Sequence, residues 1–346
     1  MKSVQKTAFA AFLVLLSLLL CSGCGSKEGG DTDEHVAEAY KAGVAHFQDQ
    51  RSFSGYWEVF GAYACLDEEI YGRTYDFSAE NEGQRGAKLL ALMMLGENPY
   101  DVDGVDLVGE ILDQGADGAF AIPVLNFLAL QAAGADIGDD LTAAYIDYCC
   151  TQMTELAMGP DIGGWAAVAL KRYMDDPVYQ DQIAAAADTY VAAVGEDLTS
   201  GSMGSGGITA GCVVTALTAL TAAGREGCDP TADEPWTKTD PLAIMYDNLF
   251  KGEENVSDYY KNQYYLQFAD LYNVLYEKKD MAWSRCGVTG EKLAALIKEA
   301  EAVADDAAVA AALEPVQALS EEERTAAAPG WGKLYYDLYT AVAAVK

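Results

Sequence analysis

The sequence predicts an all-α protein: about six repeated helix pairs followed by a C-terminal helical bundle. An Ala-Leu pair recurs in four apolar segments, and its alanines lie 38, 40 and 50 residues apart, at Ala91, Ala129, Ala169 and Ala219. A second helical pattern follows each segment, and no run of alternating apolar and polar residues competes as a strand. Repeats of this length are typical of stacked units, here a helix pair of roughly 40 to 50 residues.

The first helix of each pair is predicted to be buried. Gly96, Gly134 and Gly224 end three of the four segments, as a glycine C-cap would. Residues 208–223 carry no charge, and a helix that is apolar on all faces belongs in a core. Similar segments at 57–66 and 262–276 bring the expected number of inner helices to about six.

The second helix of each pair is predicted to lie outside, since acidic residues occupy one of its faces. Asp139 and Asp140 precede an apolar stripe that begins at Leu141. Asp240 and Pro241 are residue types preferred at the N-cap and at the first position of a helix. Helix pairs of this kind can close into a ring or continue as an open solenoid.

The N-terminus has the pattern of an exported chain. Two lysines within residues 1–6 precede an uncharged run at 7–20. This run of roughly 14 residues is shorter than the about 20 that a helix needs to span a bilayer. The pattern predicts a signal peptide over residues 1–23, which is removed from the mature protein.

The segment Cys21-Ser22-Gly23-Cys24, with the polar residues after it, resembles the lipobox of bacterial lipoproteins. The resemblance implies cleavage before Cys24 and a diacylglycerol group on its thiol, although Cys21 stands where a leucine is usual. Two or three acyl chains would give lasting membrane anchorage. The alternative is ordinary secretion with Cys24 as a free thiol.

Three further parts are expected in the mature chain. Residues 24–35 are predicted to be a flexible spacer, because 25–33 contain no apolar residue. Residues 36–287 are predicted to form the repeat domain. Residues 288–346 are predicted to form a small helical module, which serves as a spacer or a docking element. Its helices are expected at 293–304, 306–319 and 332–344.

The mature chain is strongly acidic. Of 22 basic side chains, Lys2 and Lys6 leave with the signal peptide, so that 20 remain against 54 acidic ones, a net charge of −34. Such a surface repels nucleic acid and anionic lipid headgroups, which excludes both as ligands. Solubility explains this acidity better than a dedicated acidic binding face does. With 51% hydrophobic residues the chain can build a sizeable core.

Six cysteines follow Cys24, and their spacing is not that of a disulfide framework. The sequence nevertheless allows a Cys212–Cys228 disulfide. The two histidines, His35 and His46, lie near the predicted spacer. The rest of the repeat domain therefore lacks the close Cys/His spacing of a zinc site.

Two segments carry a family resemblance. Residues 161–170 (DIGGWAAVAL) and 204–217 (GSGGITAGCVVTAL) resemble repeats of the squalene cyclase and protein prenyltransferase superfamily. Similar prenyltransferase-repeat proteins are exported by anaerobic Gram-positive bacteria. The resemblance covers roughly residues 56–276 and implies an α/α toroid of inner and outer helix pairs. Cobalamin carriers with the same fold bind a ligand without doing chemistry.

The motifs that would carry chemistry in this superfamily are missing. A protonating cyclase needs an Asp-x-Asp-Asp cluster, because one carboxyl must stay protonated beside its neighbours. An ionising terpene synthase uses Asp-Asp-x-x-Asp, and neither string occurs. A protein prenyltransferase needs a histidine among its zinc ligands, and no histidine follows His46. No catalytic residue or metal ligand is predicted, and the sequence names no cofactor.

The candidate ligand-binding residues are polar and aromatic side chains on, or at the start of, the predicted inner helices. Such groups at the mouth of an apolar cavity could orient a ligand. Each of them alone fits a capping or packing role better, so the hypothesis concerns the set. The set comprises Gln84, Arg85, Asp117, Asn126, Asp161, Trp165, Asn262, Gln263 and Tyr265.

Two functions of different classes follow. The first is a non-catalytic binding protein on the extracytoplasmic face of the cell membrane of a Gram-positive-like bacterium. Acylated Cys24 would anchor it, and its toroid would bind an unidentified small ligand or surface protein. The second is a terpenoid cyclase-superfamily enzyme, with carboxylates such as Asp117 and Asp161 as acid or base. The missing motifs favour the first. Carboxylates converging in an apolar cavity would favour the second, and a filled cavity would favour a scaffold role.

Overall fold

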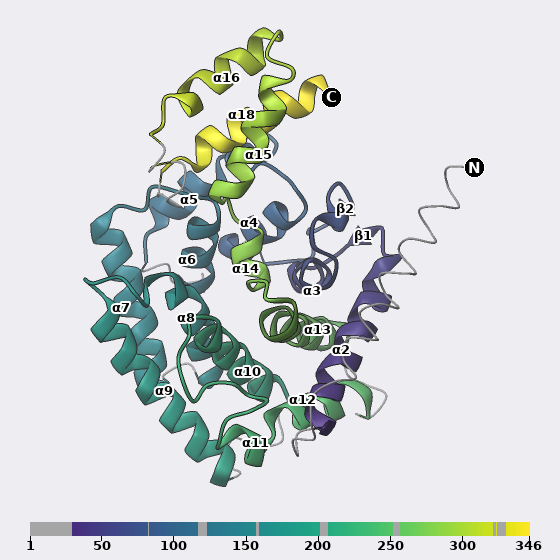
Figure 1. The fold of residues 1–346 in the computed structure, drawn as a ribbon, viewed down its shortest axis with the longest axis vertical. Helices are drawn as coiled ribbons and strands as arrows, with labels where there is room; N and C mark the ends of the chain where they lie inside the picture. Colours follow the sequence, from purple (N-terminus) through teal and green to yellow (C-terminus); the bar gives the residue numbers. More distant parts are fainter. Residues whose placement is uncertain are drawn as a thin grey trace.

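The computed structural model describes residues 30–81, 83–116, 123–156, 159–200, 207–251, 257–320, 323 and 330–346. This part of the chain is mostly helical, which confirms the all-α prediction (Figure 1). Two short strands, β1 (Ser52–Phe53) and β2 (Thr74–Tyr75), pair in parallel and were not predicted. The predicted signal peptide and Cys24 lie outside the described residues. Within those residues, no helix is long and apolar enough to cross a membrane.

Six helices correspond to the predicted inner ones. They are α3 (Tyr56–Leu66), α4 (Arg85–Met94), α6 (Pro123–Ala132), α8 (Pro160–Leu170), α10 (Gly207–Ala222) and α13 (Asp258–Tyr272). Each packs against the next in this order, and α13 packs against α3, so that the contacts return to the first helix. The short helix α14 (Ala282–Arg285) lies between α3, α4, α6, α8 and α13 in Figure 1.

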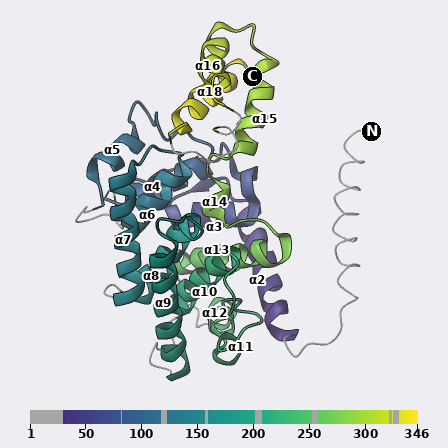
Figure 2. The same ribbon diagram turned by 60° about the vertical axis from the view of Figure 1, so that its left-hand side comes forward.

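A second set of helices packs against these six. It consists of α2 (Gly30–Gln48), α5 (Leu107–Gln114), α7 (Asp139–Glu155), α9 (Gln180–Ser200) and α12 (Pro241–Phe250). α7 contacts α6 and α8, α12 contacts α10 and α13, and α7 and α9 run side by side along one edge (Figure 2). Short helical turns complete the fold: η1 (Asp67–Ile70), η2 (Lys171–Tyr173), α11 (Trp236–Thr239) and η3 (Asn273–Glu277).

The capping signals in the sequence behave as predicted. Gly96, Gly134 and Gly224 have φ angles of 85°, 63° and 78°, in the left-handed region that glycine enters without a steric penalty. The Asp240 carboxylate accepts a hydrogen bond of 2.9 Å from the amide of Ala243, while Pro241 is the first residue of α12. These local signals therefore mark the ends of the helices correctly.

The predicted spacer is too long. Helix α2 begins at Gly30, so residues 30–35, which the sequence assigned to a flexible segment, are helical. The reason is tertiary contact. The His35 ring stacks on Tyr246 of α12 with centroids 3.9 Å apart, and the Tyr276 hydroxyl donates a hydrogen bond of 2.5 Å to Asp33. Composition alone did not reveal these partners.

The three C-terminal helices are observed where they were predicted. α15 (Gly290–Glu301), α16 (Ala307–Gln317) and α18 (Gly332–Val345) pack against one another. The start of α18 sits on the end of α6, because the Gly332 amide donates a hydrogen bond of 3.1 Å to the Gly134 carbonyl. A Cβ at Gly332 would overlap the Ala133 carbonyl, so only glycine permits this approach.

All six cysteines of the described body are buried and free. The Cys212–Cys228 bridge that the sequence left open is therefore not formed. Burial raises the pKa of Cys228 to about 11, which keeps its thiol protonated and unreactive. These cysteines serve as small apolar core residues.

Candidate binding site

Eight of the nine predicted site residues lie in the described part of the chain. Asp117 lies outside it. The others fall at the amino ends or in the first halves of four of the six inner helices: Gln84 and Arg85 at α4, Asn126 on α6, Asp161 and Trp165 on α8, and Asn262, Gln263 and Tyr265 on α13. They serve different purposes there.

The residues at α4 and α6 have structural partners. Asn126 is only 1% exposed, and its Oδ1 accepts a hydrogen bond of 3.0 Å from the Gly86 amide in the first turn of α4. A Cβ at Gly86 would overlap Asn126 and its neighbours, so the two helices touch closely here. Arg85 pairs with Glu110 of α5 at 3.0 Å on the surface. Gln84 is the N-cap residue of α4. This group joins helices together.

Tyr265 faces away from the rest of the set. Its ring packs against His46 and Phe47 of α2, with centroid separations of 5.1 and 5.8 Å. The structure therefore does not bring Tyr265 together with the other candidates. Tyr265 instead holds α2 against α13.

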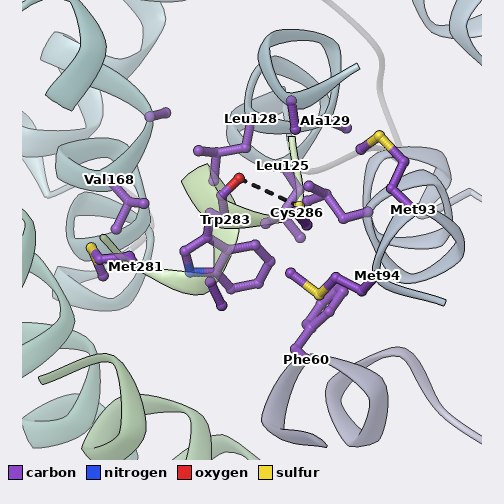
Figure 3. Close-up of a cluster of buried hydrophobic side chains, with 14 of the residues drawn as sticks. Phe60, Met93, Met94, Leu125, Leu128, Ala129, Val168, Met281, Trp283 and Cys286 are labelled. Carbon is purple, nitrogen blue, oxygen red and sulfur yellow. Dashed lines mark hydrogen bonds between the residues drawn. The ribbon is translucent and has the colours of Figure 1, made fainter. Parts of the chain in front are cut away.

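Trp165 belongs to a closed set of four aromatic rings in the middle of the six helices. It contacts Trp57 of α3 at 5.3 Å and Trp283 of α14 at 5.2 Å between ring centroids. Phe60 completes the set, at 4.7 Å from Trp283 and 5.3 Å from Trp57. Figure 3 shows Trp283 and Phe60 side by side among other apolar side chains. Aromatic rings thus fill the space where a central pocket was expected.

Polar groups without hydrogen-bond partners lie on the helices around this aromatic set. Asp161, one turn before Trp165, bonds to Thr209 through its carboxylate, but its buried Oδ1 has no partner among the described residues. Burial raises the pKa of Asp161, and the Thr209 hydrogen bond opposes this. On α13, the buried Oδ1 of Asn262 also lacks a described partner, while Gln263 bonds to the Tyr259 hydroxyl.

The sequence prediction missed Gln267 and Asp270. Gln267 is 1% exposed, and neither of its amide atoms has a partner among the described residues. The side chain packs on Gly211 of α10, where a Cβ would overlap it. Gln263, Gln267 and Asp270 follow the i, i+4, i+7 spacing of one helix face. That polar stripe inside a predicted buried helix was the signal that could have identified both residues.

Asp270 holds the amino end of α14 in place. Its Oδ1 accepts a hydrogen bond of 2.7 Å from the Ala282 amide. Burial raises the pKa of Asp270 from 3.8 to about 7, against the opposing effects of Arg285, the Ala282 amide and Lys171. The next carboxylate, Asp280, accepts from the Met281 amide at 2.8 Å. The two carboxylates therefore position the helix that carries Trp283.

The buried carboxyl of Asp270 predicts a pH-dependent stability. The pKa of Asp270 is higher in the folded state than in the unfolded state. The neutral carboxyl therefore contributes stability that is fully present below about pH 4 and is lost as the pH rises through about 7. Asp270→Asn keeps an acceptor for Ala282 but cannot ionise. We expect the stability difference between variant and wild type to shift in favour of the variant by about 3 kcal/mol between pH 5 and pH 8. Urea unfolding at both pH values measures it.

Asp175→Asn, at an exposed position, is the matched control. Its free energy of unfolding should differ from that of the wild type by the same amount at pH 5 and at pH 8. If the difference between wild type and Asp270→Asn were the same at pH 5 and pH 8, the burial of this carboxyl as described would be wrong.

Within the described residues, no group of three or more His, Cys, Asp or Glu side chains is arranged to hold a metal ion. Comparison with protein-family models, with curated proteins and with solved structures finds no match to this chain. The assignment of a function therefore depends on the geometry and on the sequence motifs.

Proposed function

We propose that the protein is a lipid-anchored, extracytoplasmic binding protein built on an α/α toroid, and that it catalyses no reaction. The toroid is supported by the six buried helices, whose contacts run from α3 through α13 and back to α3. The outer helices pack against this set, as in the fold that the sequence resemblance implies. The C-terminal helices would be a separate module docked on α6.

One observation carries the non-catalytic part of the proposal. The four contacting rings of Trp57, Phe60, Trp165 and Trp283 occupy the middle of the helices, where a cyclase would need space for a substrate of several isoprene units. The buried Asp270 is engaged in capping α14 instead of facing an open cavity. Among the described residues, these two features support a binding protein over a terpenoid cyclase.

The unpaired polar atoms of Asp161, Asn262 and Gln267 support a binding role. A buried donor or acceptor without a partner costs free energy, and such groups are rare in folded proteins. These atoms lie near the amino end of α8 and along α13, the helices that carry Trp165 and pack against α3. A small ligand or a segment of a partner protein could supply the missing hydrogen bonds.

The position of α2 supports an orientation on the membrane. Asp33, near the start of α2, accepts a hydrogen bond from Tyr276, which follows α13 in the chain. Tyr40 stacks on Tyr272, the last residue of α13. Five residues separate Cys24 from Gly30, a reach of at most about 20 Å. An anchor at Cys24 would hold this end of the molecule near the membrane. The amino ends of the inner helices, with Asp161, would then face away from the membrane.

Incubation with isoprenoid substrates separates this proposal from the cyclase alternative. Purified protein is mixed with squalene, or with farnesyl diphosphate and Mg²⁺, and the extract is examined by gas chromatography and mass spectrometry. We expect no cyclised or hydrolysed product from wild type or from Asp161→Asn. A product formed by wild type and lost in Asp161→Asn would overturn the proposal in favour of an enzyme.

A further inference from the structure

A cavity of about 190 Å³ lies where the inner helix α4 and the turn η1 meet the C-terminal helices α15 and α18. Figure 1 shows α15 and α18 at the end of the molecule that holds α4 and α5. Met93, Cys286 and Leu296, each at most 5% exposed, form an apolar part of its wall. The volume is below the about 300–1,000 Å³ of drug-sized sites, so the cavity suits a smaller molecule.

Tyrosines from both sides of this junction line the cavity, and Tyr71, Tyr335 and Tyr339 among them are partly exposed. Tyr335 and Tyr339 lie one turn apart on α18, with their rings within 11° of parallel and their centroids 6.2 Å apart. Tyr71 comes from the inner-helix side, where its ring packs on Gly96 after the end of α4. Accessible aromatic surface from two distant parts of the chain therefore meets in one small space.

The hydroxyls of Tyr335 and Tyr339 are available to a ligand. Neither has a hydrogen-bond partner among the described residues, and both side chains are partly exposed, so a ligand in the cavity can reach them. Burial raises the pKa of each tyrosine. The two hydroxyls therefore stay protonated and can donate as well as accept hydrogen bonds.

The charged side chains that line the cavity are already paired. Glu68 lies 3.5 Å from the Nζ of Lys292, and Glu299 lies 2.6 Å from the Nζ of Lys346. An ionic ligand would therefore meet no unpaired charge among the described residues. A neutral ligand with several hydroxyls needs none, because a paired carboxylate keeps free lone pairs and a paired ammonium group keeps further N–H donors.

We propose that this cavity binds one pyranose ring of a neutral sugar. The C–H face of a pyranose with equatorial hydroxyls packs on an aromatic ring, while its hydroxyls point outward from the ring edge. The Tyr335 and Tyr339 hydroxyls, Glu68 and Lys292 offer donors and acceptors to those hydroxyls. The site is separate from the unpaired polar groups on α8 and α13, so it goes beyond the proposed function and does not depend on what binds there.

Saturation-transfer NMR and calorimetric titration of the mature protein test the site, in a detergent without a sugar headgroup. Methyl β-glucopyranoside is the probe, sorbitol is its acyclic match, and choline represents an organic cation. We expect saturable binding of the glucoside with a Kd of about 1 mM. Sorbitol, which carries hydroxyls but no ring face, should bind at least about tenfold more weakly. Choline should not bind, because the carboxylates of the cavity are paired.

Variants separate the rings from their hydroxyls. Tyr335→Phe and Tyr339→Phe each keep the ring and remove one hydroxyl, so each should weaken glucoside binding about threefold. Tyr339→Ala removes a ring and should weaken it about tenfold. Tyr260→Ala is the matched control, since it removes an exposed tyrosine of α13 outside this cavity, and it should leave the affinity unchanged. Circular dichroism melting curves establish that each variant is folded.

The proposal is overturned if the glucoside shows no saturable binding up to about 50 mM, or if sorbitol binds as tightly as the glucoside. It is also overturned if both folded Phe variants bind the glucoside as wild type does, or if Tyr260→Ala weakens binding as much as Tyr339→Ala. Choline binding that Tyr339→Ala abolishes would overturn it in favour of a site for an organic cation. Each of these results leaves the cyclase test above unaffected.

Discussion

Cys24→Ser should abolish lipid attachment and release the protein from its acyl anchor. Two or three acyl chains bury enough hydrocarbon to make anchorage lasting, whereas a serine at this position offers no thiol for them. Metabolic labelling with a fatty-acid analogue, followed by partition between detergent and aqueous phases, measures the effect. We expect wild type to be labelled and to enter the detergent phase, and Cys24→Ser to incorporate no label.

Cys21→Ser is the matched control, because it replaces a cysteine only three residues away. This variant should be labelled as wild type is, since the resemblance to a lipobox places the lipid on Cys24. Label that persists in Cys24→Ser would show that the anchor is elsewhere, and a wild-type chain that takes up no label would show that it is absent.

Trp283→Ala should have the largest effect on stability. The ring is 2% exposed and contacts Phe60 and Trp165, so its removal loses buried apolar surface and leaves a cavity in a packed core. Truncation of a buried tryptophan or phenylalanine costs about 3–5 kcal/mol. Urea unfolding followed by circular dichroism should show a loss in this range.

The exposed Val178→Ala, at 76% exposure, should change stability by less than about 0.5 kcal/mol. A double-mutant cycle with Trp165→Ala adds a more specific test. Aromatic pairs in contact couple by about 0.5–1.5 kcal/mol. Additive effects of the two truncations, or a loss below about 1 kcal/mol for Trp283→Ala, would mean that the rings do not fill the centre.

The sequence was sufficient to predict the inner and C-terminal helices, because the signals for them are local, but it missed the first residues of α2. The apolar runs around Ala91, Ala129, Ala169 and Ala219 are helices, and the glycines after three of them adopt positive φ angles. The buried character of these segments followed from the small number of charged residues on their faces. The three C-terminal helices were recognised for the same reason.

The filled centre could not be predicted, because it depends on contacts between distant residues. Trp283 lies on a four-residue helix after the last repeat, and nothing near it in sequence indicates that it meets Phe60 and Trp165. The role of Asn126 likewise required the position of Gly86 on a neighbouring helix. Trp165, Asp161 and Asn262 were chosen for their residue types, and only the fold shows which of them lie beside unpaired polar groups.

The proposed binding function is tested most directly by native mass spectrometry of the protein extracted from the membranes of its own host. We predict a chain that begins at a lipid-bearing Cys24 and that carries a non-covalent small molecule or protein, released on collisional activation. A Gln267→Leu variant should carry less of that adduct, because its side chain can no longer form hydrogen bonds. A lipid-bearing wild-type chain with no adduct of either kind would contradict the account.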